Sequence, residues 1–205
     1  MTRHSMMRKA TGTALLTALF LTAGCVRFGT NPPDRLLGLT STSSVEAGKV
    51  VTGTSGSAIT VLPPLIARSI GTPRVAVIDS SGAFAYVKDA IWVDTPDKLF
   101  QGLLSETIAV RTGRLVLNPG QFIAEPNRQL IGQLISFGID AGRKEAVVTY
   151  DASLLAPDGA TINKQRFSAT APIGKIDAKT VAPAISAAAN SVAEQVADWI
   201  KAQPG

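Results

Sequence analysis

The sequence predicts an α/β domain of the α+β kind, in which a mixed, largely antiparallel sheet packs against two helices. Two features of the 205-residue chain lead to this prediction. Short apolar segments fill the first half, and three long segments that resemble strands, one of them with clear apolar–polar alternation, fill the second. Two further segments carry apolar residues at helical spacing, one between these groups and one at the end of the chain. Strands and helices in this order are typical of helices layered on a sheet.

The first half predicts four short strands around a polar loop. Residues 74–78 are apolar without polar alternation, which favours a central strand that is buried on both faces. Residues 40–57 are rich in Ser, Thr and Gly, so we expect a mobile loop there. The strands are expected at residues 35–39, 58–62, 74–78 and 84–87.

Residues 95–112 predict the first helix. Thr95 is a candidate N-cap and Pro96 suits the first helical position, while Asp97 complements the positive end of the helix dipole. Gly113 is a natural C-terminal stop. One face of this helix is apolar and should pack on the sheet; it comprises Leu99, Phe100, Leu103, Leu104 and Ile108.

The second half predicts strands and a closing helix. Within 145–155, alternation of apolar and polar residues indicates one buried and one wetter face. Residues 156–159 read Ala-Pro-Asp-Gly, a turn sequence, and join this strand to the next. The closing helix begins near Asp177 or Thr180 and ends at Lys201; Pro183 favours the later start, because proline is tolerated only in the first turn. The expected strands are 115–117, 129–140, 145–155 and 160–171.

The N-terminus predicts export and lipid attachment. Residues 1–24 combine a basic start, an apolar run from 14 to 21 and small residues before Cys25, which is typical of a signal peptide. The segment resembles a lipobox, although Thr22 stands where Leu is usual. We therefore expect cleavage between Gly24 and Cys25, and acyl chains such as palmitate on Cys25. The alternative is an ordinary secretory signal with a chance cysteine.

This interpretation divides the chain into three parts: signal peptide 1–24, lipidated tether 25–34 and one domain over 35–205. Residues 26–34 span roughly 30 Å when extended, so the domain should stay close to its membrane.

Composition narrows the function. The signal holds three of the twenty basic residues and none of the fifteen acidic ones, so the mature chain carries a net charge of only +2. Nucleic-acid binding thus loses its main support. The only histidine is His4, within the signal, and Cys25 is the only cysteine. Histidine and cysteine catalysis, His or Cys metal sites and disulfides are excluded, and we expect no cofactor.

Carboxylate chemistry stays open as a weaker alternative. Its candidates are Asp89, Asp94 and Asp97, but solvated loop and helix-cap roles explain these side chains more simply. We therefore expect no catalytic residue and no enzyme.

Several segments together resemble the ABC-type transport auxiliary lipoproteins. They are residues 59–64, the strand pair leading to Trp92, the helix with Leu103 and Leu104, residues 133–137 and the closing helix with residues 187–190 and 197–200. The resemblance implies a non-catalytic subunit that accompanies ABC transporters and mammalian-cell-entry (MCE) proteins in moving lipids across the bacterial envelope. The implied partners are an MCE-type periplasmic protein and ABC permease and ATPase subunits, with self-association into a homo-oligomer as a further expectation.

Two alternatives accompany the hypothesis of a transport subunit. One is a structural or assembly lipoprotein of the outer membrane without a transport role, and the other is a carboxylate hydrolase. Val26 follows the cysteine where Asp would suggest inner-membrane retention, which favours a periplasm-facing anchor in the outer membrane. Pro63, Pro64 and Trp92 are the candidate contacts for a partner or lipid. The two prolines could equally stop a strand, and Trp92 could be a core residue.

Overall fold

The computed structural model describes residues 35–120 and 127–203. The predicted signal peptide, Cys25 and the predicted tether lie outside these residues, as does the segment 121–126. Within the described part, no helix combines the length and the apolarity needed to cross a membrane. The strands are β1 (Ile59–Val61), β2 (Leu65–Ile66), β3 (Arg74–Ile78), β4 (Phe84–Ile91), β5 (Val116–Leu117), β6 (Arg128–Asp140), β7 (Glu145–Leu155) and β8 (Ile162–Pro172), and the helices are α1 (Pro96–Thr112) and α2 (Val181–Lys201).

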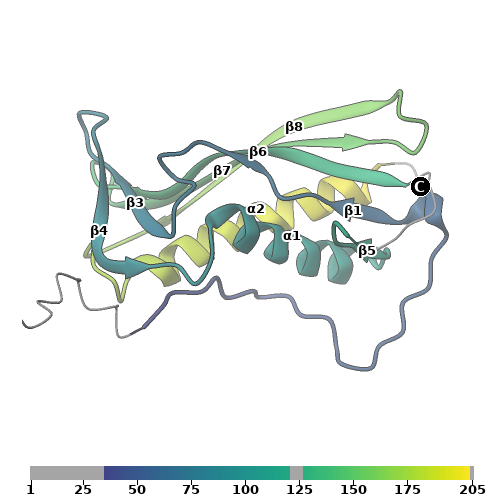
Figure 1. Ribbon diagram of the computed structural model, residues 1–205, viewed down its shortest axis with the longest axis horizontal. Helices are drawn as coiled ribbons and strands as arrows, with labels where there is room; N and C mark the ends of the chain where they lie inside the picture. The colour runs from purple at the N-terminus through teal and green to yellow at the C-terminus, as the bar shows by residue number, and fades with distance from the viewer. Residues whose placement is uncertain (1–34, 121–126, 204–205) are drawn as a thin grey trace, which may run out of the picture. The chain divides into compact units, whose positions relative to one another are not determined.

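Strand β6 organises the sheet. Along one edge it pairs in parallel with three short strands in succession: β1 at its start, β2 in the middle and β3 at its end. β4 and β5 continue the sheet beyond β3 and β1. The first half of the chain therefore lies along a single strand of the second half (Figure 1).

The other edge of β6 begins an antiparallel meander. β6 pairs with β7 along its length, with a bulge between Leu134 and Ser136, and β7 pairs with β8. The prediction of a mixed, largely antiparallel sheet is confirmed. The alternation in β7 is confirmed too, because Val148, Tyr150 and Ala152 are buried and their neighbours are half-buried.

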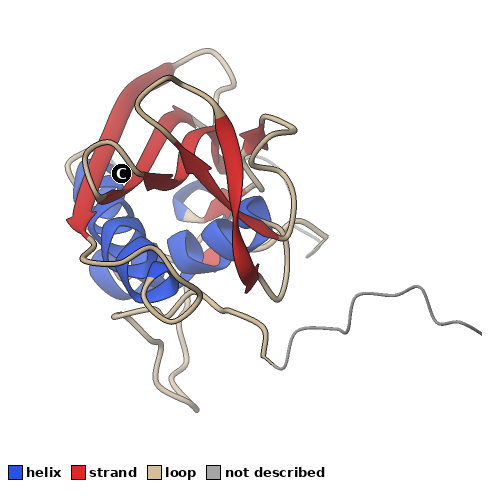
Figure 2. Cartoon of the chain, turned by 90° about the vertical axis from the view of Figure 1, so that its left-hand side faces the viewer, coloured by secondary structure: helices blue, strands red, loops and turns tan. Residues whose placement is uncertain are grey.

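Both helices lie on one face of the sheet, and the hydrophobic core fills the space between the helices and the sheet (Figure 2). Phe100 of α1 lies at its centre, with its ring 5.4 Å from that of Tyr150 and 6.3 Å from that of Phe137. The predicted packing of Leu103 and Leu104 against the core is confirmed, since both are buried. The helices are also joined at their surface by an ion pair of 2.8 Å between Arg111 and Asp198.

The helix ends agree with their sequence signals. Thr95 is the N-cap of α1 and Pro96 begins it, although the Thr95 side chain makes no capping hydrogen bond. Gly113 closes the helix in the left-handed conformation, with φ of 69°, and its N–H bonds to the carbonyl of Ala109. α2 starts after Thr180, which confirms the later of the two expected starts and places Pro183 in its first turn.

Two expectations for the first half need correction, and one strand was not expected. Residues 35–39 do not form a strand: only Leu37 pairs, in one parallel bridge with Trp92, because Leu36 and Gly38 on either side are exposed and unpaired with the sheet. The strand expected at 84–87 continues to Ile91. β2 was not predicted, because two residues directly after a Pro-Pro pair give no pattern.

Candidate functional site

The three predicted contact residues occupy different environments. Trp92 is only 2 % exposed, and its ring lies 5.8 Å from that of Phe137, so it is a core residue. Of the two alternatives for Trp92, the core residue is therefore confirmed and the exposed contact is wrong. Pro64 is buried as well, whereas Pro63 is exposed. Of the three, only Pro63 has an exposed side chain. That Pro63 binds a partner or lipid stays a prediction.

Pro63 borders a hollow on the sheet face opposite the helices. The hollow has a volume of about 420 Å³ and is lined by Leu65, Gln133, Asp151 and Lys164, among others. Asp151 is held there by Arg166 of the neighbouring strand, through a hydrogen bond of 2.8 Å to Nη2. Because Arg166 binds and stabilises the carboxylate, the pKa of Asp151 is lowered. The carboxylate that lines the hollow is therefore paired within the sheet.

Two of the three candidate carboxylates, Asp94 and Asp97, have local roles at the start of α1. Asp94 accepts a hydrogen bond from the backbone N–H of Thr95 and lies 3.6 Å from Lys98. Asp97 is the acidic residue in the first turn of α1, as expected for a residue that complements the dipole. Asp89 is exposed on β4, in a left-handed conformation with φ of 57°. Within the described part of the chain, no group of three or more His, Cys, Asp or Glu side chains could hold a metal ion.

The most elaborate polar cluster is centred on Asn190 of α2. Its Oδ1 accepts hydrogen bonds from the backbone N–H and the hydroxyl of Thr42, at 2.8 and 2.9 Å. Its Nδ2 donates to the carbonyls of Thr40 and Ser186, both at 2.7 Å. Asn190 is 5 % exposed, and these four bonds use its full hydrogen-bonding capacity.

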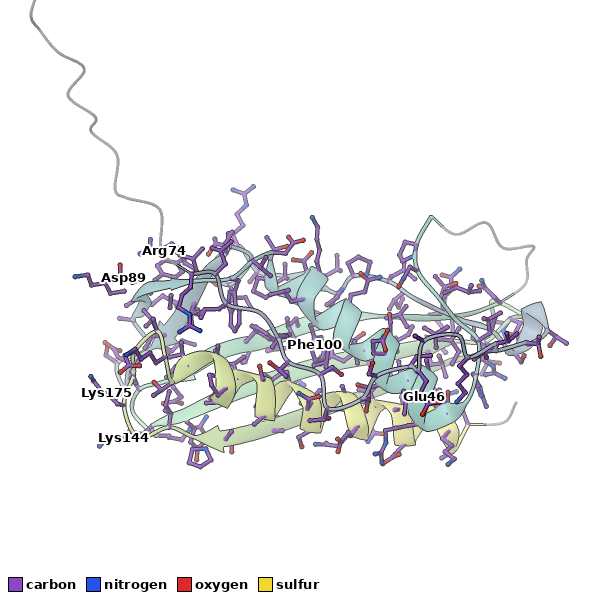
Figure 3. All side chains as sticks on the ribbon, turned by 90° about the horizontal axis from the view of Figure 1, so that it is seen from below. Glu46, Arg74, Asp89, Phe100, Lys144 and Lys175 are labelled. Carbon is purple, nitrogen blue, oxygen red and sulfur yellow. The ribbon has the colours of Figure 1, made fainter. Side chains whose placement is uncertain are left out.

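Asn190 thereby fixes the chain segment that leads into the domain. Thr40 also donates its N–H to Oγ of Ser186, and Val45 donates its N–H to Glu106 of α1. We call residues 35–45 the entry segment. It crosses the exposed side of both helices, and Glu46, just beyond it, is labelled in Figure 3. Composition alone predicted a mobile loop from residue 40, whereas its first residues are anchored.

A groove separates part of the entry segment from α2. It has a volume of about 650 Å³ and lies between residues 35–42 on one side and residues 178–190 on the other. We call it the α2 groove. Its lining is largely apolar, with Leu36, Ala182 and Pro183 among the contributors, and Leu36 is 53 % exposed. A groove of this size falls within the usual range for small-ligand sites, about 300–1,000 Å³.

The charged residues of the α2 groove are basic. Arg35 and Lys179 line it, and no acidic residue does among the part of the chain that the structure describes. The nearest acid along the chain, Asp177, accepts the backbone N–H of Lys179 and pairs with Lys175 at 3.2 Å. The hydrogen bond from the backbone N–H of Lys179 is the main cause that lowers the pKa of Asp177. The ionised carboxylate is already engaged by this N–H and by Lys175. No sequence pattern indicates this groove, because its two sides lie far apart in the chain.

Comparison with known proteins identifies a related family. Residues 40–197 match the family described as the ABC-type transport auxiliary lipoprotein component. The matched region includes most of the described domain, from the entry segment to the last turn of α2. No functionally curated protein matches the chain by sequence.

Two crystal structures share the fold. One is a protein of Xanthomonas campestris assigned to family DUF330, with a TM-score of 0.64 and 17 % identity, covering 81 % of this chain and 94 % of its own. The other is an uncharacterised protein with a TM-score of 0.58 and 12 % identity, covering 71 % of this chain and 90 % of its own. At these identities the likeness concerns the fold alone.

Proposed function

Because the chain belongs to the ABC-type transport auxiliary lipoprotein family, we propose that it is a non-catalytic accessory subunit of an ABC/MCE-type system that moves lipids across the bacterial envelope. The family match over residues 40–197 is the observation that carries the proposal. The chain itself supplies no phosphate-binding loop, so the energy for transport comes from a separate ATPase. Its own role is to bind an MCE-type periplasmic protein and the permease subunits.

The anchor assigned to Cys25 supports this role. A lipidated Cys25 holds the domain at the membrane, and Val26 after it favours the outer membrane, with the domain facing the periplasm. Acyl chains on one residue make such attachment stable without a spanning helix. Cys25→Ser should release a soluble periplasmic protein or leave an uncleaved precursor. A processed Cys25→Ser protein that stays on membranes after a high-salt wash would contradict lipid anchoring.

Deletion of the gene tests the transport role. Loss of a transport subunit should alter the lipid composition of the outer membrane and reduce resistance to detergents. A plasmid copy of the wild-type gene should restore both, and a Cys25→Ser copy should not. Unchanged lipid composition and detergent resistance in the deletion strain would contradict a transport role. A structural or assembly lipoprotein would then be the better account.

A further inference from the structure

We propose that the α2 groove binds an anionic phospholipid taken from the membrane to which the protein is anchored. The phosphate lies against Arg35 and Lys179, and one acyl chain follows the apolar floor formed by α2. This inference rests on the proposed function, because lipid attachment at Cys25 is what brings the groove to a membrane. It adds to that function a ligand and the residues that hold it.

Charge is the first argument. Arg35 and Lys179 are exposed, line the groove and have no ion pair among the residues that the structure describes. Asp177, the nearest acid along the chain, is paired with Lys175, and Glu194 accepts a hydrogen bond of 3.4 Å from the hydroxyl of Thr42 in the groove wall. Lys144 lies at the same end of the domain, where α2 begins, as do the acidic Asp89 and Lys175, which is paired with Asp177 (Figure 3). Arg35 and Lys179 therefore leave two positive charges without an ion pair at the groove, among the described residues, and each basic side chain near an anionic surface adds to its attraction.

The second argument is the apolar lining of the α2 groove, which favours a lipid over a free anion as the ligand. Ala182, Pro183 and Ala187 present small apolar groups along one side of the groove, opposite Leu36. A site for inorganic phosphate would need converging donors in place of these residues. Two basic side chains beside an apolar channel are complementary to an amphiphile with a negative headgroup.

The position of the groove is the third argument. Arg35 is the first described residue, and it lies ten positions after Cys25, with nine residues between them. Even fully extended, that length of chain spans roughly 35 Å, so the groove stays within this distance of the acylated cysteine. The bonds from Asn190 and Ser186 fix the wall of the groove, so that its width does not depend on a free loop.

Photolabelling of the full-length acylated protein tests the proposal. The protein is reconstituted in phosphatidylcholine vesicles that contain phosphatidylglycerol with a diazirine in one acyl chain, and labelled peptides are mapped by mass spectrometry after irradiation. Label should concentrate in residues 35–42 and 178–190. Phosphatidylcholine carrying the same diazirine should label these peptides less.

Variants of the groove sharpen the test. Arg35→Ala and Lys179→Ala should each reduce labelling about fivefold, as expected when one basic contact with an anionic lipid is removed. Lys49→Ala is the matched control: Lys49 is an exposed lysine outside the groove, and its removal should leave labelling unchanged. Ala187→Trp fills the groove and should abolish the label in 178–190. Circular dichroism confirms that each variant is folded.

Equal labelling of these peptides by the two lipids, or equal labelling of wild type, Arg35→Ala and Lys179→Ala, would overturn the proposal. Co-purification of the wild-type protein with transport subunits separates this failure from failure of the proposed function. If partners are recovered and the groove is unlabelled, the lipid site is wrong and the accessory role stands. If the groove is labelled and no partner is recovered, the lipid site stands and the accessory role is wrong.

Discussion

The ring of Tyr150 lies directly over Gly132 of the neighbouring strand. A Cβ atom built on Gly132 would lie 2.5 Å from the Tyr150 hydroxyl and 2.6 Å from Cε2 of its ring, and would collide with the carbonyl of Asp151. Only glycine leaves room for the tyrosine at this position. The absence of one side chain in β6 thus allows Tyr150 to reach Phe100 in the core.

Gly132→Ala should therefore destabilise the domain. Overpacking of this kind costs about 1–3 kcal/mol in the free energy of unfolding, measured by urea denaturation. Gly102→Ala is the matched control, because nothing lies within 4 Å of a Cβ at Gly102 in α1. Alanine in a helix interior should raise stability by about 0.5–1 kcal/mol. If both substitutions have the same effect, Tyr150 does not occupy the space over Gly132.

Tyr150→Phe should leave stability unchanged or raise it. The Tyr150 hydroxyl is buried and has no hydrogen-bond partner among the described residues, and burial raises its pKa. Removing an unsatisfied hydroxyl removes its desolvation cost, about 1–3 kcal/mol for a group of this kind. Tyr86→Phe is the comparison, because Tyr86 donates to the carbonyl of Ser69 at 3.2 Å and should lose about 0.5–1.5 kcal/mol. A larger loss at Tyr150 than at Tyr86 would mean that the hydroxyl has a partner.

Asn190→Ala should free the entry segment while leaving the sheet intact. The substitution removes both acceptor bonds to Thr42 and the donor bond to Thr40. The Thr42 amide should then exchange faster in hydrogen–deuterium exchange, with unchanged protection in β6 and β7. Gln195→Ala, an exposed change on the same helix, is the control and should alter neither region. Unchanged exchange at Thr42 in Asn190→Ala would refute the anchoring of the entry segment.

The Asp151–Arg166 pair should make stability depend on pH in the acid range. Arg166 lowers the pKa of Asp151 below its usual 3.8 in the folded state. The resulting stabilisation is present above that usual value and is lost as the pH falls through the lower, folded pKa. Arg166→Gln should bring the pKa of Asp151 back toward its usual value and reduce the acid-dependent loss of stability. NMR titration of the Asp151 carboxyl measures its pKa in both proteins. An unchanged pKa in Arg166→Gln would contradict the role of Arg166 in lowering it.

Sequence reasoning succeeded where the signal is local. The limits of α1 follow from Thr95, Pro96 and Gly113, and the start of α2 follows from Pro183, because these residues restrict their own backbone. The strands β6, β7 and β8 were predicted nearly to their ends, since long alternating runs specify a face.

The features that sequence reasoning missed depend on contacts between distant residues. For Trp92 the sequence left a core role and an exposed contact open, because its pairing with the distant Leu37 is not indicated by the residues around it. Asn190 and Thr42 are 148 residues apart, so neither suggests the other in sequence. The α2 groove exists only because their hydrogen bonds hold the entry segment beside α2. The candidate site could therefore be found only once the chain was folded.

Purification of the full-length protein from membranes in mild detergent, followed by mass spectrometry of what accompanies it, tests the accessory role most directly. The account predicts that an MCE-type protein or an ABC permease subunit is recovered in amounts comparable to the tagged protein. It also predicts their loss when Cys25→Ser removes the anchor. Repeated recovery of the acylated protein alone, under conditions that keep other envelope complexes together, would contradict a role as a transport subunit.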